Sequence, residues 1–138
     1  MPSLELSASP RSPRDARRFV NDAIEAWGVA GDTRDVIRLL TTELVTNAML
    51  HGSPPINLDV ARNGSTILVA VADTNPMPPV VRPFDPAAAT GHGLLLMDRL
   101  AARWGVEANA NGKRVWFEVR RTPASVPSTM SVPAPAGR

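Results

Sequence analysis

Apolar residues recur at spacings of three and four over the first part of the chain, which predicts two consecutive amphipathic helices. The first predicted helix begins at Ser12 as the N-cap, with proline next to it, and ends at Gly28. The second begins near Asp32 and ends at His51 and Gly52, where the glycine is typical of a helix C-terminus. The first part of the chain is therefore predicted to be mainly helical.

Beyond these helices, alternating or continuous apolar runs replace the helical spacing and predict strands. Asn63-Gly64 separates two such runs and is typical of a hairpin turn. A proline-rich stretch over residues 73–90 is predicted to be a long loop, and residues 94–100 a third helix. The predicted strands are residues 4–6, 56–61, 66–72, 106–108 and 114–120.

The resulting order is strand, two helices, two strands, long loop, helix and two strands. This order predicts an α+β fold, a two-layer sandwich in which helices pack on one face of a mixed, mostly antiparallel sheet. We divide the chain into an N-terminal strand or arm over residues 1–9, a folded domain over 10–121 and a tail over 122–138. The tail has four prolines and no aromatic residue, so it is predicted to be disordered.

Composition excludes several kinds of site. The chain of 138 residues has no cysteine, which excludes disulfides and thiolate chemistry, and its two histidines argue against a multi-histidine metal site. The net charge is +2, and Lys113 is the only lysine among 15 basic residues. So small an excess does not indicate nucleic-acid binding. Because no membrane-spanning run or signal sequence is present, we expect a cytoplasmic protein without direct membrane or nucleic-acid partners.

Three polar residues lie at successive i+4 positions of the second predicted helix: Glu43, Asn47 and His51. They form a stripe beside the apolar face of that helix. A carboxylate, an amide and an imidazole in this arrangement are suited to holding a hydrated Mg²⁺ and to activating a nucleophile. The solvated edge of an ordinary amphipathic helix shows the same pattern, so the stripe alone leaves both interpretations open.

Two further features are suited to ligand binding. Asp73 is the first polar residue after an apolar strand, where its carboxylate can accept a hydrogen bond from a ligand amine or bond to its own turn. Gly91 and Gly93 flank His92 where the third helix is predicted to begin, so backbone N–H groups there can approach an anion. An ordinary loop-to-helix junction would explain the same glycines, and the string is not a Walker phosphate loop.

These signals occur in one order, and together they carry a family resemblance. The segment ELVTNAMLHG (43–52) resembles the N box of the GHKL ATPase superfamily, which includes gyrase, heat-shock chaperones, histidine kinases and MutL. The segments VADTNP (71–76), TGHGLLLMDRLAARWGV (90–106) and GKRVWFEV (112–119) are similar to its G1 box, its G2 box and its closing strand. Over about residues 10–120 the chain resembles the short anti-sigma-factor kinases of the SpoIIAB/RsbW type found in actinomycetes.

The resemblance implies a histidine kinase-like ATPase domain with an ATP site between the helical layer and the long loop. It implies that Glu43 is the general base, that Asn47 is the Mg²⁺ ligand, and that His51 faces the phosphates. It also implies that Asp73 receives the adenine amino group. The other residues assigned to ATP binding by the resemblance are Asn75, Gly91, His92, Gly93 and Leu94. The proline-rich stretch over 76–90 would be a lid.

Two positions depart from the family pattern. Asn75 stands where the G1 box usually has glycine, and because asparagine tolerates positive φ, the turn is expected to survive. Arg114 stands where the closing strand usually has a threonine that helps bind adenine through water. This second departure bears on the strength of adenine binding.

The resemblance implies a serine/threonine protein kinase that uses ATP and Mg²⁺. Its substrate would be a serine of a small anti-anti-sigma (STAS) protein, which competes with a sigma factor for the kinase, and the kinase would be a homodimer. The alternative is a nucleotide-gated protein-binding module of the same fold with little or no kinase activity. The two departures at Asn75 and Arg114 motivate this alternative.

Overall fold

The computed structural model describes residues 2–7, 9–29, 31–77 and 93–121, and its elements follow the predicted order. In chain order they are β1 (Ser3–Leu6), α1 (Ser12–Ala26), α2 (Gly31–His51), β2 (Ile56–Asn63), β3 (Thr66–Asp73), α3 (Gly93–Leu100), β4 (Arg103–Asn109) and β5 (Gly112–Arg120). The predicted tail over 122–138 and most of the predicted lid lie outside the described residues.

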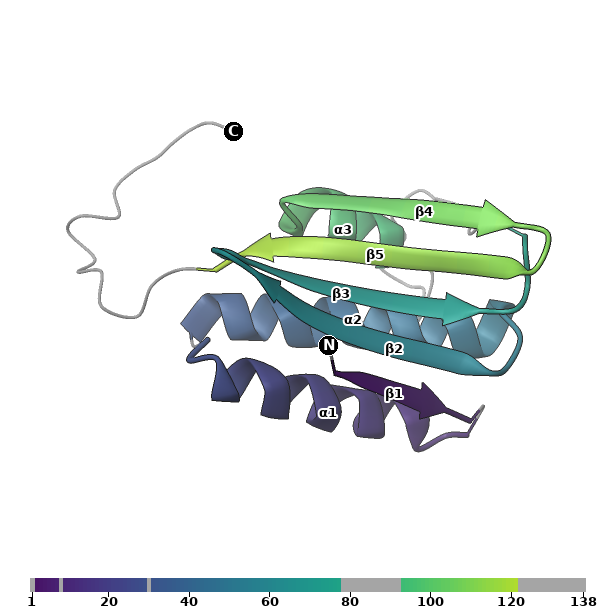
Figure 1. Ribbon diagram of the computed structural model, residues 1–138, viewed down its shortest axis with the longest axis horizontal. Helices are drawn as coiled ribbons and strands as arrows, with labels where there is room; N and C mark the ends of the chain where they lie inside the picture. The colour runs from purple at the N-terminus through teal and green to yellow at the C-terminus, as the bar shows by residue number, and fades with distance from the viewer. Residues whose placement is uncertain (1, 8, 30, 78–92, 122–138) are drawn as a thin grey trace, which may run out of the picture.

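The five strands form one sheet in the order β1-β2-β3-β5-β4, and each pairing between described strands is antiparallel. The helices cover one face of this sheet, with α2 behind β2 and β3 and α3 behind β4 and β5 (Figure 1). The predicted two-layer α+β sandwich is therefore confirmed. Strand β3 is central, which agrees with its almost continuously apolar sequence.

One apolar core lies between the sheet and the helices. Alternate residues of β3 and β5 face it, among them Val69 and the fully buried Phe117. Helix α2 contributes Leu40 and Leu44, and α3 contributes Met97. Because the same alternation continues along both strands, the last residue of β3 and the second residue of β5 also face inward. In the described part of the chain, no helix has the length and apolar character needed to cross a membrane.

Several element boundaries differ from the sequence prediction by one to three residues, and two differences at element starts have a structural cause. Helix α1 has Arg11 in the N-cap position, and the hydroxyl of Ser12 donates to the backbone carbonyl of Ser7 instead of capping the helix. Strand β4 begins at Arg103, three residues earlier than predicted, because its pairing with β5 extends that far. A Cβ at Gly105 would lie 2.8 Å from the ring of Trp116, so this glycine lets the indole lie across β4.

Candidate functional site

Helix α2 carries the predicted polar stripe on its C-terminal half. Glu43 and Asn47 are half-buried, whereas His51 is exposed at the last helical position. Since a helix rises about 1.5 Å per residue, Asn47 lies roughly 6 Å and Glu43 roughly 12 Å from His51 along the axis. The stripe thus leads along the helix toward its C-terminal end.

The C-terminal end of α2 meets the end of β3. The backbone N–H of Ser53 donates to Oδ1 of Asp73 at 3.3 Å, and Nδ2 of Asn75 donates to the carbonyl of His51 at 2.9 Å. The N–H of Thr74 donates to the carbonyl of Ser53 at 3.0 Å. The fold therefore brings the predicted G1 aspartate to the end of the predicted N-box helix.

The carboxylate of Asp73 is buried, with its side chain 3% exposed. Its Oδ1 accepts hydrogen bonds from the N–H groups of Ser53 and Asn75, at 3.3 and 2.8 Å, and from Nζ of Lys113 at 3.2 Å. Its Oδ2 lies 3.0 Å from the same Nζ, and among the described residues this is its one polar partner.

The bond from the Asn75 N–H is the turn-forming contact that was the alternative interpretation of Asp73. It engages Oδ1 only. A carboxylate oxygen has two lone-pair sites, so Oδ2 keeps capacity to accept a hydrogen bond from a ligand. The two interpretations of Asp73 are therefore compatible in this structure, because each concerns a different oxygen.

Lys113 belongs to this cluster, although the sequence analysis did not include it. Its side chain is 6% exposed, and Nζ also donates to the carbonyl of Asn75 at 3.2 Å. The β3–β5 register places it directly opposite Asp73. The available signal was a lone lysine beside Gly112 at the start of a strand whose alternate residues are apolar. That alternation puts Lys113 on the inward face.

Two glycines permit this close packing. Gly112 has φ of 149°, and a Cβ there would lie 2.2 Å from the backbone oxygen of Asp73, so a side chain does not fit. A Cβ at Gly52 would lie 2.6 Å from Cγ and Oδ2 of Asp73 and from the backbone oxygen of Ala48. The α2 end of the site is therefore lined by backbone next to Oδ2.

Replacing Gly52 with alanine should displace the Asp73 carboxylate. The added methyl group meets both that carboxylate and the helix backbone, so we expect a loss of about 1–3 kcal/mol in the free energy of unfolding. Urea unfolding measures it. Ser53→Ala is the matched control, because Ser53 contacts Asp73 through its backbone N–H and should keep wild-type stability. Equal stability of both variants would contradict the close approach at Gly52.

The departure at Asn75 does not act as predicted. No non-glycine residue in the described ranges has positive φ, so the turn does not use the left-handed conformation that asparagine tolerates. Hydrogen bonds hold the turn instead. The N–H of Asn75 bonds to Asp73, its Nδ2 to His51, and its Oδ1 accepts from the N–H of Met77 at 3.0 Å. The asparagine thus ties this turn to α2.

Arg114 lies on the opposite face of the sheet from Asp73. It follows Lys113 in β5, and successive residues of a strand face opposite sides. Its NH1 is 3.4 Å from Oε1 of Glu107 on the neighbouring strand β4. The second departure from the family pattern is therefore away from the Asp73 cluster.

The G2-box residues are described only in part. Helix α3 begins at Gly93, and the buried Met97 of this helix is part of the core that α2 shares. Gly91 and His92 lie outside the described residues, as does the side chain of Leu94. The predicted roles of these residues stay predictions.

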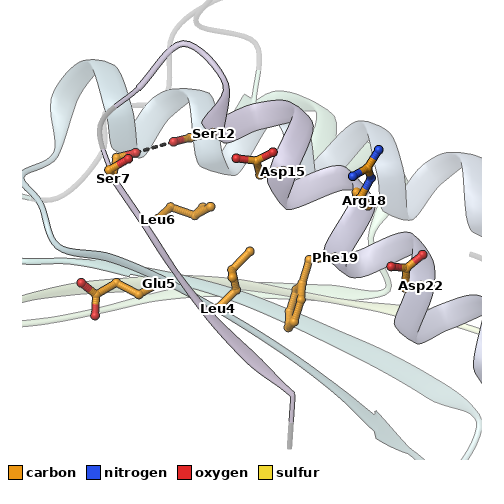
Figure 2. A pocket seen from close by; sticks show the side chains of 9 residues that line it. All are labelled: Leu4, Glu5, Leu6, Ser7, Ser12, Asp15, Arg18, Phe19 and Asp22. Atoms are coloured by element: carbon orange, nitrogen blue, oxygen red, sulfur yellow. Dashed lines mark hydrogen bonds between the residues drawn. The ribbon is translucent and has the colours of Figure 1, made fainter.

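A separate groove lies at the edge of the sheet formed by β1, between β1 and α1 (Figure 2). Its volume is about 380 Å³, and its walls combine Leu4, Leu6 and Phe19 with charged residues such as Asp15 and Asp22. None of the predicted site residues lines this groove. The groove and the Asp73 cluster are thus distinct features.

Known structures show the same arrangement of elements. A Mycobacterium tuberculosis chain that contains RsbU and RsbW domains superposes with a TM-score of 0.68 at 20% identity, over 90% of this chain and 34% of that chain. The blue-light activated histidine kinase of Erythrobacter litoralis gives 0.52 at 18% identity, over 77% of this chain and 42% of that chain. At such identities the likeness concerns the fold, and this chain spans about a third of the mycobacterial one.

Sequence comparison defines the family. An uncharacterized protein of Streptomyces coelicolor is 37% identical over 102 residues, which cover 69% of this chain and 91% of that protein. The family model of the histidine kinase-like ATPase domain matches residues 6–119, which include the α2 stripe, Asp73 and Lys113. The chain therefore belongs to the histidine kinase-like ATPase domain family.

Proposed function

We propose that this chain binds ATP with Mg²⁺ beside Asp73 and acts as a serine/threonine protein kinase of the anti-sigma-factor type. One observation carries the proposal. The buried Asp73 carboxylate lies against the C-terminal end of the same helix that presents Glu43 and Asn47. A hydrogen-bond acceptor for the base, an amide and a carboxylate would thus follow one another from the end of β3 along α2.

Asp73 would recognise the adenine. Its Oδ2 has acceptor capacity left, and the exocyclic amino group of adenine is a donor. The neighbouring Gly52 places backbone, not a side chain, next to this oxygen. The remaining acceptor capacity of Oδ2 supports the proposed base site.

The donor set on α2 fits magnesium. In the described ranges, no group of three or more His, Asp or Glu side chains gathers into a metal site. Mg²⁺ usually takes one or two protein oxygen ligands and completes its shell with water and substrate phosphates, so Asn47 and the phosphates would suffice. When bound, Mg²⁺ neutralises charge on the phosphates. Asn47 would hold it through the side-chain oxygen.

Glu43 would act on the phosphoryl acceptor. It lies one helical turn before Asn47 on the same half-buried stripe. Its carboxylate would orient the hydroxyl of a partner's serine and accept the hydroxyl proton as the serine oxygen bonds to the γ-phosphorus and the bond from that phosphorus to the departing ADP breaks. Phosphoryl transfer needs mainly positioning and charge neutralisation, so one such carboxylate is enough.

The proposed partners are a STAS protein as phosphoryl acceptor and a sigma factor as sequestered ligand, with the kinase as a homodimer. The motif resemblance and the structural likeness to a chain with an RsbW domain support this choice. The alternative, a nucleotide-gated module without kinase activity, was motivated by Asn75 and Arg114. The Asn75 side chain is hydrogen-bonded to the end of α2, and Arg114 faces away from Asp73. Neither departure therefore disturbs the Asp73 cluster, so the kinase is favoured.

Calorimetric titration with ATP, with and without Mg²⁺, tests the nucleotide site. We expect binding that Mg²⁺ strengthens. Incubation with Mg²⁺-ATP and STAS proteins of the source organism then tests the kinase, with phosphoserine detected by mass spectrometry. Binding without transfer to any of these proteins would support the nucleotide-gated module. Absence of ATP binding would refute both versions of the function.

A further inference from the structure

We infer that Lys113 is a positioning residue for nucleobase recognition: it fixes the Asp73 carboxylate so that Oδ2 alone accepts from the base. The inference rests on the proposed ATP site and adds the residue that makes Asp73 selective for the amino group of the base. It is carried by the buried contacts among Lys113, Asp73 and Asn75.

Lys113 has no donor left for a ligand. Its ammonium group carries three protons, and three oxygens surround Nζ: Oδ1 of Asp73 at 3.2 Å, Oδ2 at 3.0 Å, and the carbonyl of Asn75 at 3.2 Å. Lys113 therefore acts on a nucleotide through Asp73, and not by direct contact.

These contacts make the two oxygens of Asp73 unequal. Oδ1 receives three donors, from Ser53, Asn75 and Lys113, whereas Oδ2 receives Lys113. The remaining acceptor capacity is therefore concentrated on Oδ2, the oxygen beside Gly52. Without Lys113, the carboxylate would keep the two backbone N–H bonds to Oδ1, but it would lose the one partner among the described residues that contacts both oxygens, so its orientation would be held less firmly.

Stability alone is a weak reason for such a pair. Removing two charges from water is costly, and replacing a buried ion pair with apolar residues is often neutral or stabilising. The sheet around the pair is otherwise apolar on this face, with Val71 and Val115 as the next inward residues. A buried carboxylate that accepts a hydrogen bond from a ligand amine does need a positive charge nearby, and Lys113 supplies it.

The test is selectivity for the amino group. Purine riboside triphosphate lacks the exocyclic amine of ATP, so wild-type protein should bind it about tenfold or more weakly. In Lys113→Met we expect the ratio of the Kd for purine riboside triphosphate to the Kd for ATP to fall close to one, together with weaker ATP binding. Arg114→Met is the matched control, because it removes a cation from the same strand on the opposite face. It should keep the wild-type ratio.

The possible outcomes distinguish failure of this inference from failure of the proposed function. If wild-type protein binds ATP selectively and folded Lys113→Met keeps the full ratio, the inference fails and the proposed function stands. If wild-type protein does not bind ATP, both fail. Should Lys113→Met not fold, Lys113→Gln, which keeps a donor without the charge, takes its place with the same expected loss of selectivity. Failure of both variants to fold would overturn the inference, because the pair would then serve the fold.

Discussion

Replacing Glu43 with glutamine should nearly abolish phosphoryl transfer and leave ATP binding nearly unchanged. Glutamine keeps the size of the side chain and loses the ability to take a proton from the acceptor serine. Groups that act as general bases contribute about 10²–10⁴-fold in rate, so we expect a loss of that size. Single-turnover transfer to the proposed STAS partner measures the rate, and calorimetry measures the ATP Kd of the same protein.

Asp35→Asn is the control for Glu43→Gln. It makes the same carboxylate-to-amide change at an exposed position two turns earlier on α2, and it should leave transfer intact. Transfer by Glu43→Gln at the wild-type rate would remove Glu43 from the chemistry. A parallel loss of ATP affinity would instead assign Glu43 to nucleotide binding.

Replacing Asp73 with asparagine should weaken both the fold and the ATP site. The change leaves Lys113 buried without a counterion, and loss of one partner of a buried ion pair costs about 3–5 kcal/mol. It also replaces one carboxylate oxygen at the proposed base site with an amide NH2 group, so we expect ATP affinity to fall by about 10–100-fold. Urea unfolding and calorimetry at a temperature where the variant is folded measure the two effects.

Glu107→Gln provides the matched control for Asp73→Asn. It breaks the ion pair with Arg114 on the other face of the sheet, where Glu107 is 66% exposed. Exposed pairs contribute about 0–1 kcal/mol, so its stability should stay near that of the wild type. Wild-type ATP affinity in folded Asp73→Asn would exclude Asp73 from the base site, and equal stability of the two variants would contradict the buried pair.

The fold could be predicted from the sequence because its signals are local. The three-and-four spacing of α1 and α2 and the Asn63-Gly64 turn each depend on residues close together in the chain. Errors occurred where a tertiary contact overrides a local preference. Ser12 has the chemistry of an N-cap, but its hydroxyl bonds to Ser7. Strand β4 extends to Arg103 because β5 offers it a partner along that length.

The site could be predicted only in part. The stripe of Glu43, Asn47 and His51 is a local helical pattern, and Asp73 was predicted from its position after an apolar strand and then from the family resemblance. Lys113 was missed because a single lysine usually lies at the surface, and only strand register shows that it faces Asp73. The hydrogen bond from Asn75 to His51 could likewise not be predicted from the sequence, since it joins the turn after β3 to the end of α2, which are distant in the chain.

The alternation along β5 has a practical consequence for observing the protein. Lys113 faces the helices and Arg114 faces the uncovered side of the sheet, although the two are adjacent. Because the chain contains no cysteine, Arg114→Cys creates a unique thiol for a fluorescent dye. Such a label sits one residue from the buried Asp73–Lys113 pair yet on the other side of a single sheet layer. It reports on changes in the strand while leaving the proposed nucleotide contacts chemically intact.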